Sequence, residues 1–600
     1  MRMTFGVKPL RHIAFTRISL RRQSRCPVFS DMPKKRGRFL HYRRRRSGGH
    51  VSFFQRSAGS RNGRVARFQF FGQKSFRIVS DCIQSSRRVN SSGLMPHSRN
   101  IWLFFGLIAL GVPLLADAGS FSLNEQSVSG LGTAYAGGAA QAEDASTLFF
   151  NPAGIVLLDQ SELQFGGHVL VPSATFTNQG SRYNLPGTPF NGLPITGGND
   201  GDAGVTHVLP NLYLTQPVFR NSPYGDLTLG IGVTVPFGLE TDYSPGWVGR
   251  YEALRAKLTT FDLQPTIAYR IWNRVSLGAG LDIQYVSARL SQAIDFGLAA
   301  QGPLSQFFAA LPPFLAGPTQ LAYLNAGFFP GGRDGVSEVT GNDWSVGFTV
   351  GGLVEYLKGN DESFFQDGRF GVSFRSAIDH TIEGRADFRE VPAITALGAP
   401  VQFPVPGLFQ DLFFNQGATA QLDLPSILRL SVYQRFERQF ALMGDITWTE
   451  WSRLQRVPIV FQNAATPSNI LPVNYDDTVR CSAGLEWYAN RDWTLRLGFA
   501  YDETPIQSPQ FGTPRIPDNN RYFLGAGFRW SPTHFMDVDF GYAHLFAEEE
   551  RVDFTDSQGH ELRGKFDISV DIVSAAVTFR WGGPREVAPV LGKDALGYKK

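Results

Sequence analysis

The feature that most constrains the fold is a two-residue alternation of large apolar side chains with small or polar ones. In "WTLRLGFAY" (493–501), tryptophan, leucine, phenylalanine and tyrosine alternate with threonine, arginine, glycine and alanine. The same alternation recurs in "YFLGAGFRW" (522–530) and "VSAAVTFRW" (573–581). A period of two places successive side chains on opposite faces of a β-strand. Aromatic residues stand at the ends of the apolar faces, as in strands that cross a membrane and end at its interfaces.

A soluble β-sandwich also alternates, so the connections between strands have to distinguish the two folds. Turns of a sandwich recur every 8–12 residues, whereas here short and long connections take turns along the chain. The short connections are 271–274, 435–439, 489–492 and 531–534, and the long ones are 291–343, 389–420, 452–474 and 504–518. Short turns on one side and long loops on the other are typical of outer-membrane barrels.

The alternating segments predict about fourteen strands, and an even number closes an antiparallel barrel. They lie near 161–176, 205–217, 225–240, 256–270, 274–290, 344–357, 368–388, 418–435, 438–455, 474–488, 492–504, 519–531, 535–549 and 564–581. The predicted fold class is therefore all-β, with a transmembrane barrel over 159–581.

Charge separates the first 94 residues from the rest of the chain. Residues 1–94 hold 23 Lys and Arg residues against two acids, Asp31 and Asp81, so the remainder is acidic in spite of the formal net charge of +5. We expect residues 1–94 to be an untranslated or dispensable basic extension. A basic nucleic-acid or organellar targeting tail is the alternative.

Residues 95–118 have the order of a secretory signal peptide. Arg99 supplies a positive n-region, residues 101–115 form an apolar h-region, and an Ala-x-Ala motif occupies 116–118. The apolar run is shorter than the roughly 20 residues of a transmembrane helix. We therefore expect the mature chain to begin at Gly119 and to be exported.

Sequence motifs for catalysis or metal binding are missing. Beyond the first 94 residues Cys481 is the sole cysteine, and the sequence contains no HExxH, GxSxG, P-loop or CxxC motif. Asp445 and Glu450 occur in a strand-like segment, where lumen or interface charge is the expected role. The sequence thus predicts no enzyme, no metal, no cofactor and no nucleic-acid partner. A lipid-modifying barrel enzyme and a structural or adhesive barrel are the alternatives.

Residues 119–158 precede the first strand and are too small and polar to form a core of their own. A barrel of about fourteen strands has a lumen too wide for its own side chains to fill. We predict that this segment is a hatch inside the lumen, with its acids Glu125, Glu143 and Asp144 paired to lumen-facing arginines. Gly154 is expected to allow a turn into the first strand.

The stretch "NEQSVSGLGTAYAGGAAQAEDASTLFFNPAG" (124–154) resembles the hatch of the long-chain fatty acid and hydrocarbon transporter family of Gram-negative outer membranes (OMPP1/FadL/TodX). The triplet Asn151-Pro152-Ala153, followed by Gly154, is characteristic. The resemblance extends over 119–581. It implies a fourteen-stranded barrel with a hatch, multi-pass location in the outer membrane, and passive uptake of a hydrophobic small-molecule ligand. Outer-membrane lipids and the barrel insertion machinery are the other implied partners.

The resemblance also implies a kink in the third strand that opens the wall, so that ligand leaves sideways into the membrane. In "IGVTVPFGLETDY" (231–243) the kink falls at Pro236, Phe237 and Gly238. Proline cannot donate a ladder hydrogen bond, and glycine weakens a strand. An ordinary bulge proline is the alternative.

The connection 291–343 is unusually apolar for an exposed loop. The resemblance implies a hydrophobic ligand-binding groove at the cell surface here. Its predicted residues are Phe307, Phe308, Leu311, Phe314, Leu315, Leu321, Tyr323 and Leu324. The alternative is that the loop buries itself on the barrel rim. A second apolar loop, 391–414, is expected to wall the same groove.

Two departures from the family pattern matter. Positions expected to carry basic residues near a bound carboxylate fall near Gln292 and Leu471, neither of which is basic. This favours an uncharged pocket and a neutral ligand, with Arg289 as the candidate polar contact. In addition, residues 582–600 continue past the aromatic that ends the last strand, and we expect a periplasmic tail there.

Overall fold

A computed structural model of the chain describes residues 120–583, except 224, 360–362, 395–400, 402 and 404–406. All of these residues belong to one compact unit, Phe104–Lys600. The predictions for residues 1–118, and for all but the first two residues of the tail 582–600, lie outside the described residues.

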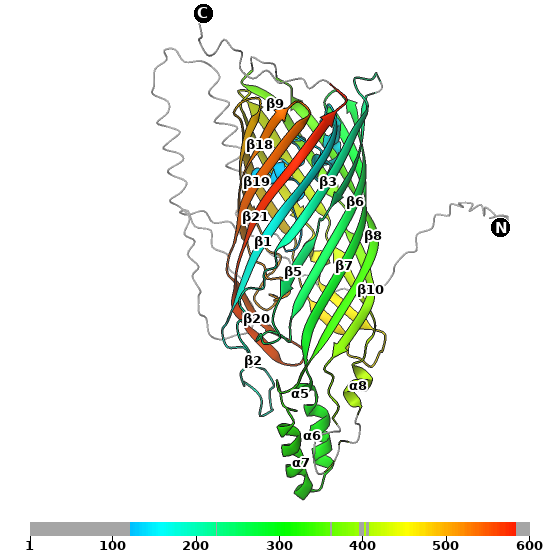
Figure 1. Ribbon diagram of the computed structural model, residues 1–600, viewed down its shortest axis with the longest axis vertical. Helices are drawn as coiled ribbons and strands as arrows, with labels where there is room; N and C mark the ends of the chain where they lie inside the picture. The colour runs from blue at the N-terminus through cyan, green and yellow to red at the C-terminus, as the bar shows by residue number, and fades with distance from the viewer. Residues whose placement is uncertain are drawn as a thin grey trace, which may run out of the picture. The chain divides into compact units, whose positions relative to one another are not determined.

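The described strands form a single antiparallel sheet that closes on itself, because β1 pairs with β3 on one side and with β21 on the other (Figure 1). Interrupted strands continue one another, so the wall has fourteen positions. In chain order these are β1 (Ser161–Asn178), β3 (His207–Phe219), β4 (Asp226–Thr234) with β5 (Gly238–Asp242), β6 (Arg255–Trp272), β7 (Val275–Asp295), β8 (Asp334–Leu357), β9 (Phe365–Arg375) with β10 (Ile378–Arg389), β12 (Ile427–Phe436) with β11 (Gln416–Leu424), β13 (Phe440–Thr449) with β14 (Arg456–Phe461), β16 (Thr478–Tyr488), β17 (Trp493–Asp502), β18 (Arg521–Thr533), β19 (Met536–Ala547) and β21 (His560–Trp581).

The predicted fold class is confirmed, and the fourteen predicted segments all contain strands. Two of the predicted long loops were drawn too wide. The connection 291–343 is in fact limited to the residues between Asp295 and Asp334, because β7 and β8 pair along their full length. The connection 452–474 contains the paired strands β14 and β15 (Asn469–Pro472), preceded by the 3-10 turn η2 (Trp451–Arg453).

The alternation of faces is confirmed in the wall. Along β17, Leu495, Leu497 and Phe499 face outward and are exposed, whereas Arg496 and Ala500 are buried inside. The apolar outer face is the one that contacts lipid in a membrane barrel. No helix among the described residues is long and apolar enough to cross a membrane.

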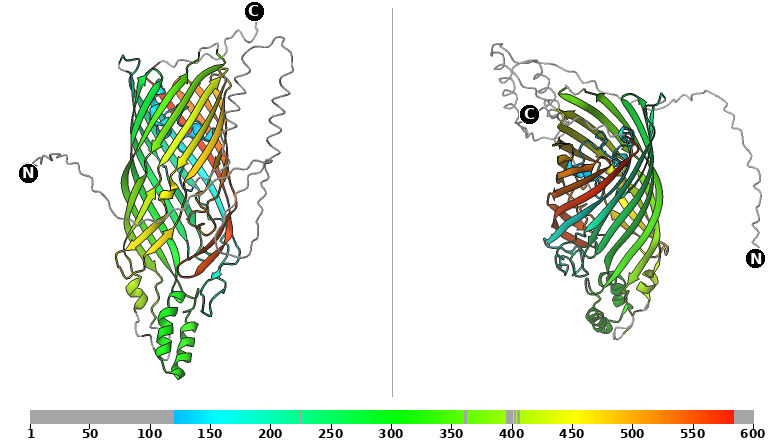
Figure 2. Two further views of the ribbon diagram at one scale, coloured as in Figure 1. Left: turned by 180° about the vertical axis from the view of Figure 1, so that it is seen from behind. Right: turned by 45° about the horizontal axis from the view of Figure 1, so that its top comes forward.

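Residues 120–158 lie within the ring of strands, nearer the end with the short turns (Figures 1 and 2). They form the short helices α3 (Val128–Gly132) and α4 (Thr147–Phe150) and the 3-10 helix η1 (Pro152–Leu157). The Ser127 side chain caps α3 by accepting a hydrogen bond from the Gly130 amide at 3.0 Å. This position agrees with the predicted hatch.

The opposite end of the barrel carries the long connections (Figure 1). Between β7 and β8 a helical hairpin extends beyond the strands, built from α5 (Phe296–Ala299), α6 (Gln301–Ala310) and α7 (Pro313–Asn325). The remaining elements of this end are β2 (Arg182–Tyr183), α8 (Leu408–Leu412) and β20 (Glu550–Thr555).

Candidate functional site

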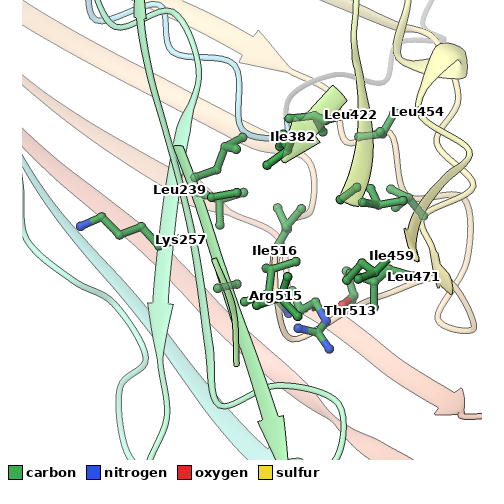
Figure 3. Close-up of a pocket in the computed structure, with 18 of the residues that line it drawn as sticks. Leu239, Lys257, Ile382, Leu422, Leu454, Ile459, Leu471, Thr513, Arg515 and Ile516 are labelled. Atoms are coloured by element: carbon green, nitrogen blue, oxygen red, sulfur yellow. Dashed lines mark hydrogen bonds between the residues drawn. The ribbon is translucent and has the colours of Figure 1, made fainter. Parts of the chain in front are cut away.

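An apolar cavity of about 120 Å³ occupies the lumen in the half of the barrel that carries the long connections (Figure 3). Its wall is formed mainly by inward-facing side chains of strands on one side of the barrel. Phe121 also lines the cavity and belongs to residues 120–126, the start of the hatch, which we call the N-terminal segment. The apolar lining residues include Leu239 of β5, Leu258 of β6, Leu290 of β7, Ile382 of β10, Leu422 of β11, Ile459 of β14 and Leu471 of β15. Such a lining suits a hydrophobic ligand, because apolar contacts replace water around it.

The loop between β17 and β18 brings one arginine to this cavity. Two hydrogen bonds hold the loop against β5 and the residues after it: the Thr241 hydroxyl donates to the Arg515 carbonyl at 3.3 Å, and the Tyr243 hydroxyl donates to the Pro514 carbonyl at 2.8 Å. The Arg515 side chain is buried, and its Nη2 donates to Oε1 of Gln292 at 2.5 Å. A guanidinium in an apolar cavity is suited to bind an anionic headgroup.

Glu252 lines the same cavity and lies close enough to Arg515 to affect it electrostatically. Burial raises the pKa of the Glu252 carboxyl to about 8 and lowers the pKa of the Arg515 guanidinium to about 10. The Oε1 atom of Glu252 is buried and has no hydrogen-bond partner among the described residues. At neutral pH Glu252 is therefore mostly protonated, and its hydroxyl can donate a hydrogen bond to a bound group.

The expectation of an uncharged pocket is wrong, because Arg515 and Glu252 reach the cavity from loops. Leu471 does line the cavity, and the amide of Gln292 orients the arginine. Arg289 occupies the outward-facing register of β7, pairs with Glu338 at 2.8 Å, and is not among the lining residues. The sequence could not assign the arginine, because loop residues follow no alternation.

The third strand of the wall is interrupted at the segment that the sequence singled out. β4 ends at Thr234 and β5 begins at Gly238, and both pair with β6. On its other edge β4 pairs with β3, whereas β5 pairs with no strand of the described chain on that side and is met there by an isolated bridge between Gly204 and Thr241. Pro236 and Phe237 therefore lie where the ladder between the second and third wall positions stops.

The N-terminal segment supplies the hydrogen bonds that the interrupted strand lacks. The Leu123 amide donates to the Pro236 carbonyl at 2.9 Å, and the Gly238 amide donates to the Phe121 carbonyl at 3.1 Å. The Gln126 side chain donates to the Val235 carbonyl at 2.6 Å and accepts from its amide at 3.1 Å. The N-terminal segment thus acts as a short substitute strand at the interruption.

A second, smaller hollow lies beside the same substitute strand. Its lining includes Ser122, Leu123, Asn124 and Pro236, together with Phe149 of the hatch. The main cavity meets the other side of this strand at Phe121. Phe121 packs on Trp451, with ring centroids 4.8 Å apart. The N-terminal segment therefore stands between the apolar cavity and the hollow beside the interrupted wall.

The predicted hatch triplet contacts the wall directly. The Asn151 side chain accepts from the Ala153 amide at 3.0 Å and donates to the carbonyls of Ala139 at 2.7 Å and Gly352 at 3.0 Å. A side chain at Gly351 would collide with the Asn151 amide, so this approach requires glycine in β8. Gly154 lies inside η1 rather than in a turn into the first strand, which corrects its expected role.

Two of the three hatch acids pair with arginines of the wall, as predicted. Glu143 binds Arg496 at 2.5 Å and Arg529 at 2.8 Å, and Asp144 binds Arg529 at 2.7 Å. Glu125 is buried but forms no ion pair with a described residue. A buried charge is costly without a partner, so this network fixes the hatch to one side of the wall.

The predicted surface-groove residues lie on the α6–α7 hairpin, away from the cavity lining. Tyr323 is buried and packs on Phe307 and Phe308, whose ring centroids are 6.3 Å and 5.8 Å from its own. Phe314 is 75% exposed and Leu321 is 59% exposed. Leu311, Leu315 and Leu324 are half-buried. From the second apolar loop, Phe403 donates its amide to the Tyr323 hydroxyl at 2.9 Å.

The inward residues that line the cavity were not predicted from the sequence, because the alternation does not tell which part of the lumen the hatch fills.

Among the described residues no cluster of His, Cys, Asp or Glu could hold a metal ion. Fold and lumen together define an outer-membrane β-barrel that encloses an apolar cavity between the packed hatch and the long connections.

Residues 110–581 match the family model described as outer membrane protein transport protein (OMPP1/FadL/TodX). The chain therefore belongs to this family, which locates it in the outer membrane. It is 28% identical over 477 residues to an outer membrane protein of Neisseria meningitidis serogroup B, an alignment that covers 77% of this chain and 95% of that protein.

It is also 27% identical over 451 residues to the long-chain fatty acid transport protein of Escherichia coli strain K12, covering 74% of this chain and 92% of that protein. The crystal structure of a Pseudomonas aeruginosa FadL homologue superposes with a TM-score of 0.63 at 24% identity, covering 77% of this chain and all of that one. That likeness supports the shared fold.

Proposed function

We propose that this protein is a passive channel for the uptake of hydrophobic molecules that carry a carboxylate, such as long-chain fatty acids. The apolar cavity with a buried arginine in its wall, next to an interrupted strand, is the observation that carries the proposal. We assign transport rather than catalysis, because the family consists of transport proteins. The named function of the Escherichia coli relative supports the ligand class.

In the proposed path, ligand is collected by the hairpin side chains and enters the cavity with its alkyl chain among the leucines. Its carboxylate binds the Arg515 guanidinium and accepts a hydrogen bond from protonated Glu252. Each buried methylene of the ligand contributes about 0.8 kcal/mol to binding, so the alkyl chain of the ligand has no driving force to leave the cavity for water. The alkyl chain has nearly the same free energy in membrane lipid as in the cavity, so an exit sideways through the barrel wall into the membrane is favoured.

We propose that the exit is the wall interruption at Pro236, Phe237 and Gly238. The hydrogen bonds from the Gly238 amide to the Phe121 carbonyl and from the Leu123 amide to the Pro236 carbonyl would hold this exit closed. Displacement of these N-terminal residues would join the cavity to the second hollow and free the edge of β5. The hatch triplet at Asn151 would then anchor the part of the segment that stays in place.

The exit is tested with Pro236→Ala combined with Gly238→Val, which restores a donor and favours regular pairing. We expect uptake of radiolabelled oleate by whole cells to fall at least tenfold, with barrel abundance and heat-modifiable gel mobility unchanged. Normal uptake by the folded variant would mean that ligand crosses toward the short-turn end instead.

The ligand class is tested by uptake of oleate and of a neutral aromatic hydrocarbon in cells with and without the gene. Loss of a buried charge-assisted hydrogen bond costs about 1.5–3 kcal/mol, so Arg515→Leu should lower oleate affinity at least tenfold while sparing the hydrocarbon. Arg515→Lys keeps the charge and should retain part of the affinity.

A neutral hydrocarbon is the second candidate ligand. It is favoured by the apolar residue Leu471 at the cavity wall and by the predominance of leucine, isoleucine, valine and alanine in the lining. Gene-dependent uptake of the hydrocarbon, with oleate uptake independent of the gene, would replace the first proposal by this one.

A further inference from the structure

The connection from β7 to β8 contains a long stretch without charge. Residues 296–332 include no Asp, Glu, Lys, Arg or His. The connection around β20, at the same end of the barrel, differs sharply: residues 548–567 carry acids and bases at about half of their positions. Since loops at an aqueous surface usually carry charge, the uncharged stretch needs a physical explanation.

The helical hairpin within this stretch exposes one apolar face. Phe314 and Leu321 are seven residues apart in α7 and thus lie on the same side of the helix. Gly317 and Pro318 lie between them and are also exposed. Figure 1 shows α6 and α7 beyond the ends of the strands, so this face does not contact the barrel wall.

The hairpin is rooted in an apolar cluster that is continuous with the cavity. Tyr323, Phe307 and Phe308 pack into a core that also contains residues of the cavity lining. The shared residues are Leu290, Val339, Ala418, Ala420, Ile459 and Leu471. Apolar side chains therefore follow one another from the exposed face of α7 to the site where we place the ligand.

We propose that the exposed face of α7 inserts into the acyl-chain layer of a lipid aggregate outside the cell, so that ligand is taken from the aggregate rather than from water. This inference rests on the proposed function and names the partner from which the channel draws. The occupant is a lipid phase, because insertion into acyl chains penalises charge and rewards exposed Phe and Leu.

A protein partner fits this face less well. Protein interfaces combine an apolar centre with a polar rim and about one hydrogen bond per 100–200 Å², and charge complementarity usually selects the partner. Around the α7 face the exposed polar groups are the uncharged side chains Ser305, Gln306, Gln320 and Asn325. They can lie at a lipid interface without the cost of burying a charge.

The test uses the full protein in nanodiscs and vesicles of zwitterionic phosphatidylcholine, with binding measured by sedimentation of sucrose-loaded vesicles. We expect the wild type to sediment with the vesicles, independently of salt, because no charge takes part. Phe314→Asp with Leu321→Asp should reduce the bound fraction at least tenfold, since burial of each side chain is worth on the order of tenfold in affinity.

The matched control is Ser557→Asp with Gln558→Asp, which adds the same charge to exposed polar positions of the turn between β20 and β21, away from the hairpin. It should change binding by less than about twofold. As a second readout, Phe314→Trp should add fluorescence that brominated phosphatidylcholine quenches beyond the wild-type level. Absence of wild-type binding, equal loss in both double variants, or association of protein-loaded nanodiscs with one another but not with protein-free vesicles would overturn the proposal.

The two proposals fail in different ways. If vesicle binding is absent while gene-dependent uptake of monomeric oleate persists, the docking proposal alone is wrong. If vesicles bind through Phe314 but the gene has no effect on uptake, the transport proposal is wrong and the lipid-binding face stands.

Discussion

The two halves of the lumen are built on the same strands, yet the inward-facing side chains of these strands differ in polarity between them. Along β7, the inward residues near the short-turn end are Ser276, Asp282 and Gln284, all buried. Further along the same face they become Val286, Ala288 and Leu290. The polar half is filled by the hatch, and the apolar half encloses the cavity. A change of chemistry along one face of one strand thus divides the barrel into a plug compartment and a ligand compartment.

The difference explains how one barrel can be closed by the hatch at one end and still accept hydrophobic ligands at the other. Polar packing in the hatch half is specific, because each buried charge needs its partner. The apolar half makes few directional demands and accepts ligands by burial of their surface. A hydrophobic molecule that reaches the hatch meets charged and hydrogen-bonded groups, which favours the sideways route through the wall over the axial one.

The largest expected effect comes from breaking the hatch network at Arg529. This side chain binds Glu143, Asp144 and Asp539 within 2.9 Å. Arg529→Ala leaves these acids with fewer cations and should cost about 3–5 kcal/mol, as when one partner of a buried pair is removed. We expect lower thermal stability on heat-modifiable gels and a raised single-channel conductance to small ions.

The matched control for this variant is Arg385→Ala on the outer surface. Arg385 pairs with Asp387 at 2.7 Å but is 69% exposed, and such pairs contribute about 0–1 kcal/mol. Equal destabilisation by the two substitutions would contradict the view that buried ion pairs hold the hatch.

A second prediction compares two adjacent glycines of β8. A Cβ at Gly351 would meet the Asn151 amide of the hatch, whereas at Gly352 the nearest atoms are at 3.6 Å. Gly351→Val should therefore displace the hatch triplet and cost about 1–3 kcal/mol, the usual range for overpacking. Gly352→Val should be nearly neutral. Urea unfolding in detergent micelles measures both, and equal midpoints would show that the triplet does not depend on this approach.

Much of this architecture could be predicted from the sequence, because the wall obeys a period of two and the connections alternate in length. The hatch, its pairing acids Glu143 and Asp144, and the interruption at Pro236 were also predictable, since each is marked by local composition or by the family resemblance. The cavity could not be predicted. Its position depends on how far the hatch reaches, and Arg515 enters from a loop in which no periodicity assigns a direction to the side chain.

Arg289 shows that the direction of a side chain within a strand could also be predicted wrongly. It was the best candidate for a polar contact by proximity in the sequence, yet the pleat turns it outward to Glu338. One residue of register decides whether a strand arginine meets ligand or the exterior. Gln292 was noted as a departure from the family pattern, and in the structure it binds the arginine that reaches the cavity from elsewhere.

The third prediction fills the ligand compartment without touching the hatch. Ala420 of β11 lines the cavity, and Ala420→Phe should occupy the space that the alkyl chain needs. We expect oleate uptake to fall more than tenfold, as expected when a tight apolar site is overpacked and ligand burial is lost, with normal barrel abundance. Gln421→Phe, on the exposed face of the same strand, is the control and should leave uptake unchanged. Undiminished uptake by Ala420→Phe would place the ligand route outside this cavity.

The smallest expected effect is a pH dependence that belongs to the ligand compartment alone. Burial raises the pKa of Glu252 to about 8, so its carboxyl is mostly protonated at pH 7 and becomes ionised as the pH rises to 9. The ionised form repels a ligand carboxylate bound at Arg515 and competes for the guanidinium. Affinity for laurate should therefore fall as the pH rises, by at most about tenfold at pH 9, the limit that one group titrating near pH 8 allows.

Glu252→Gln should keep the neutral hydrogen-bonding group and abolish the pH dependence of laurate affinity. A neutral hydrocarbon should bind with the same affinity at each pH in either protein. Calorimetric titration in detergent at pH 7, 8 and 9 measures these affinities. A laurate affinity that rises with pH would exclude Glu252 from the headgroup site.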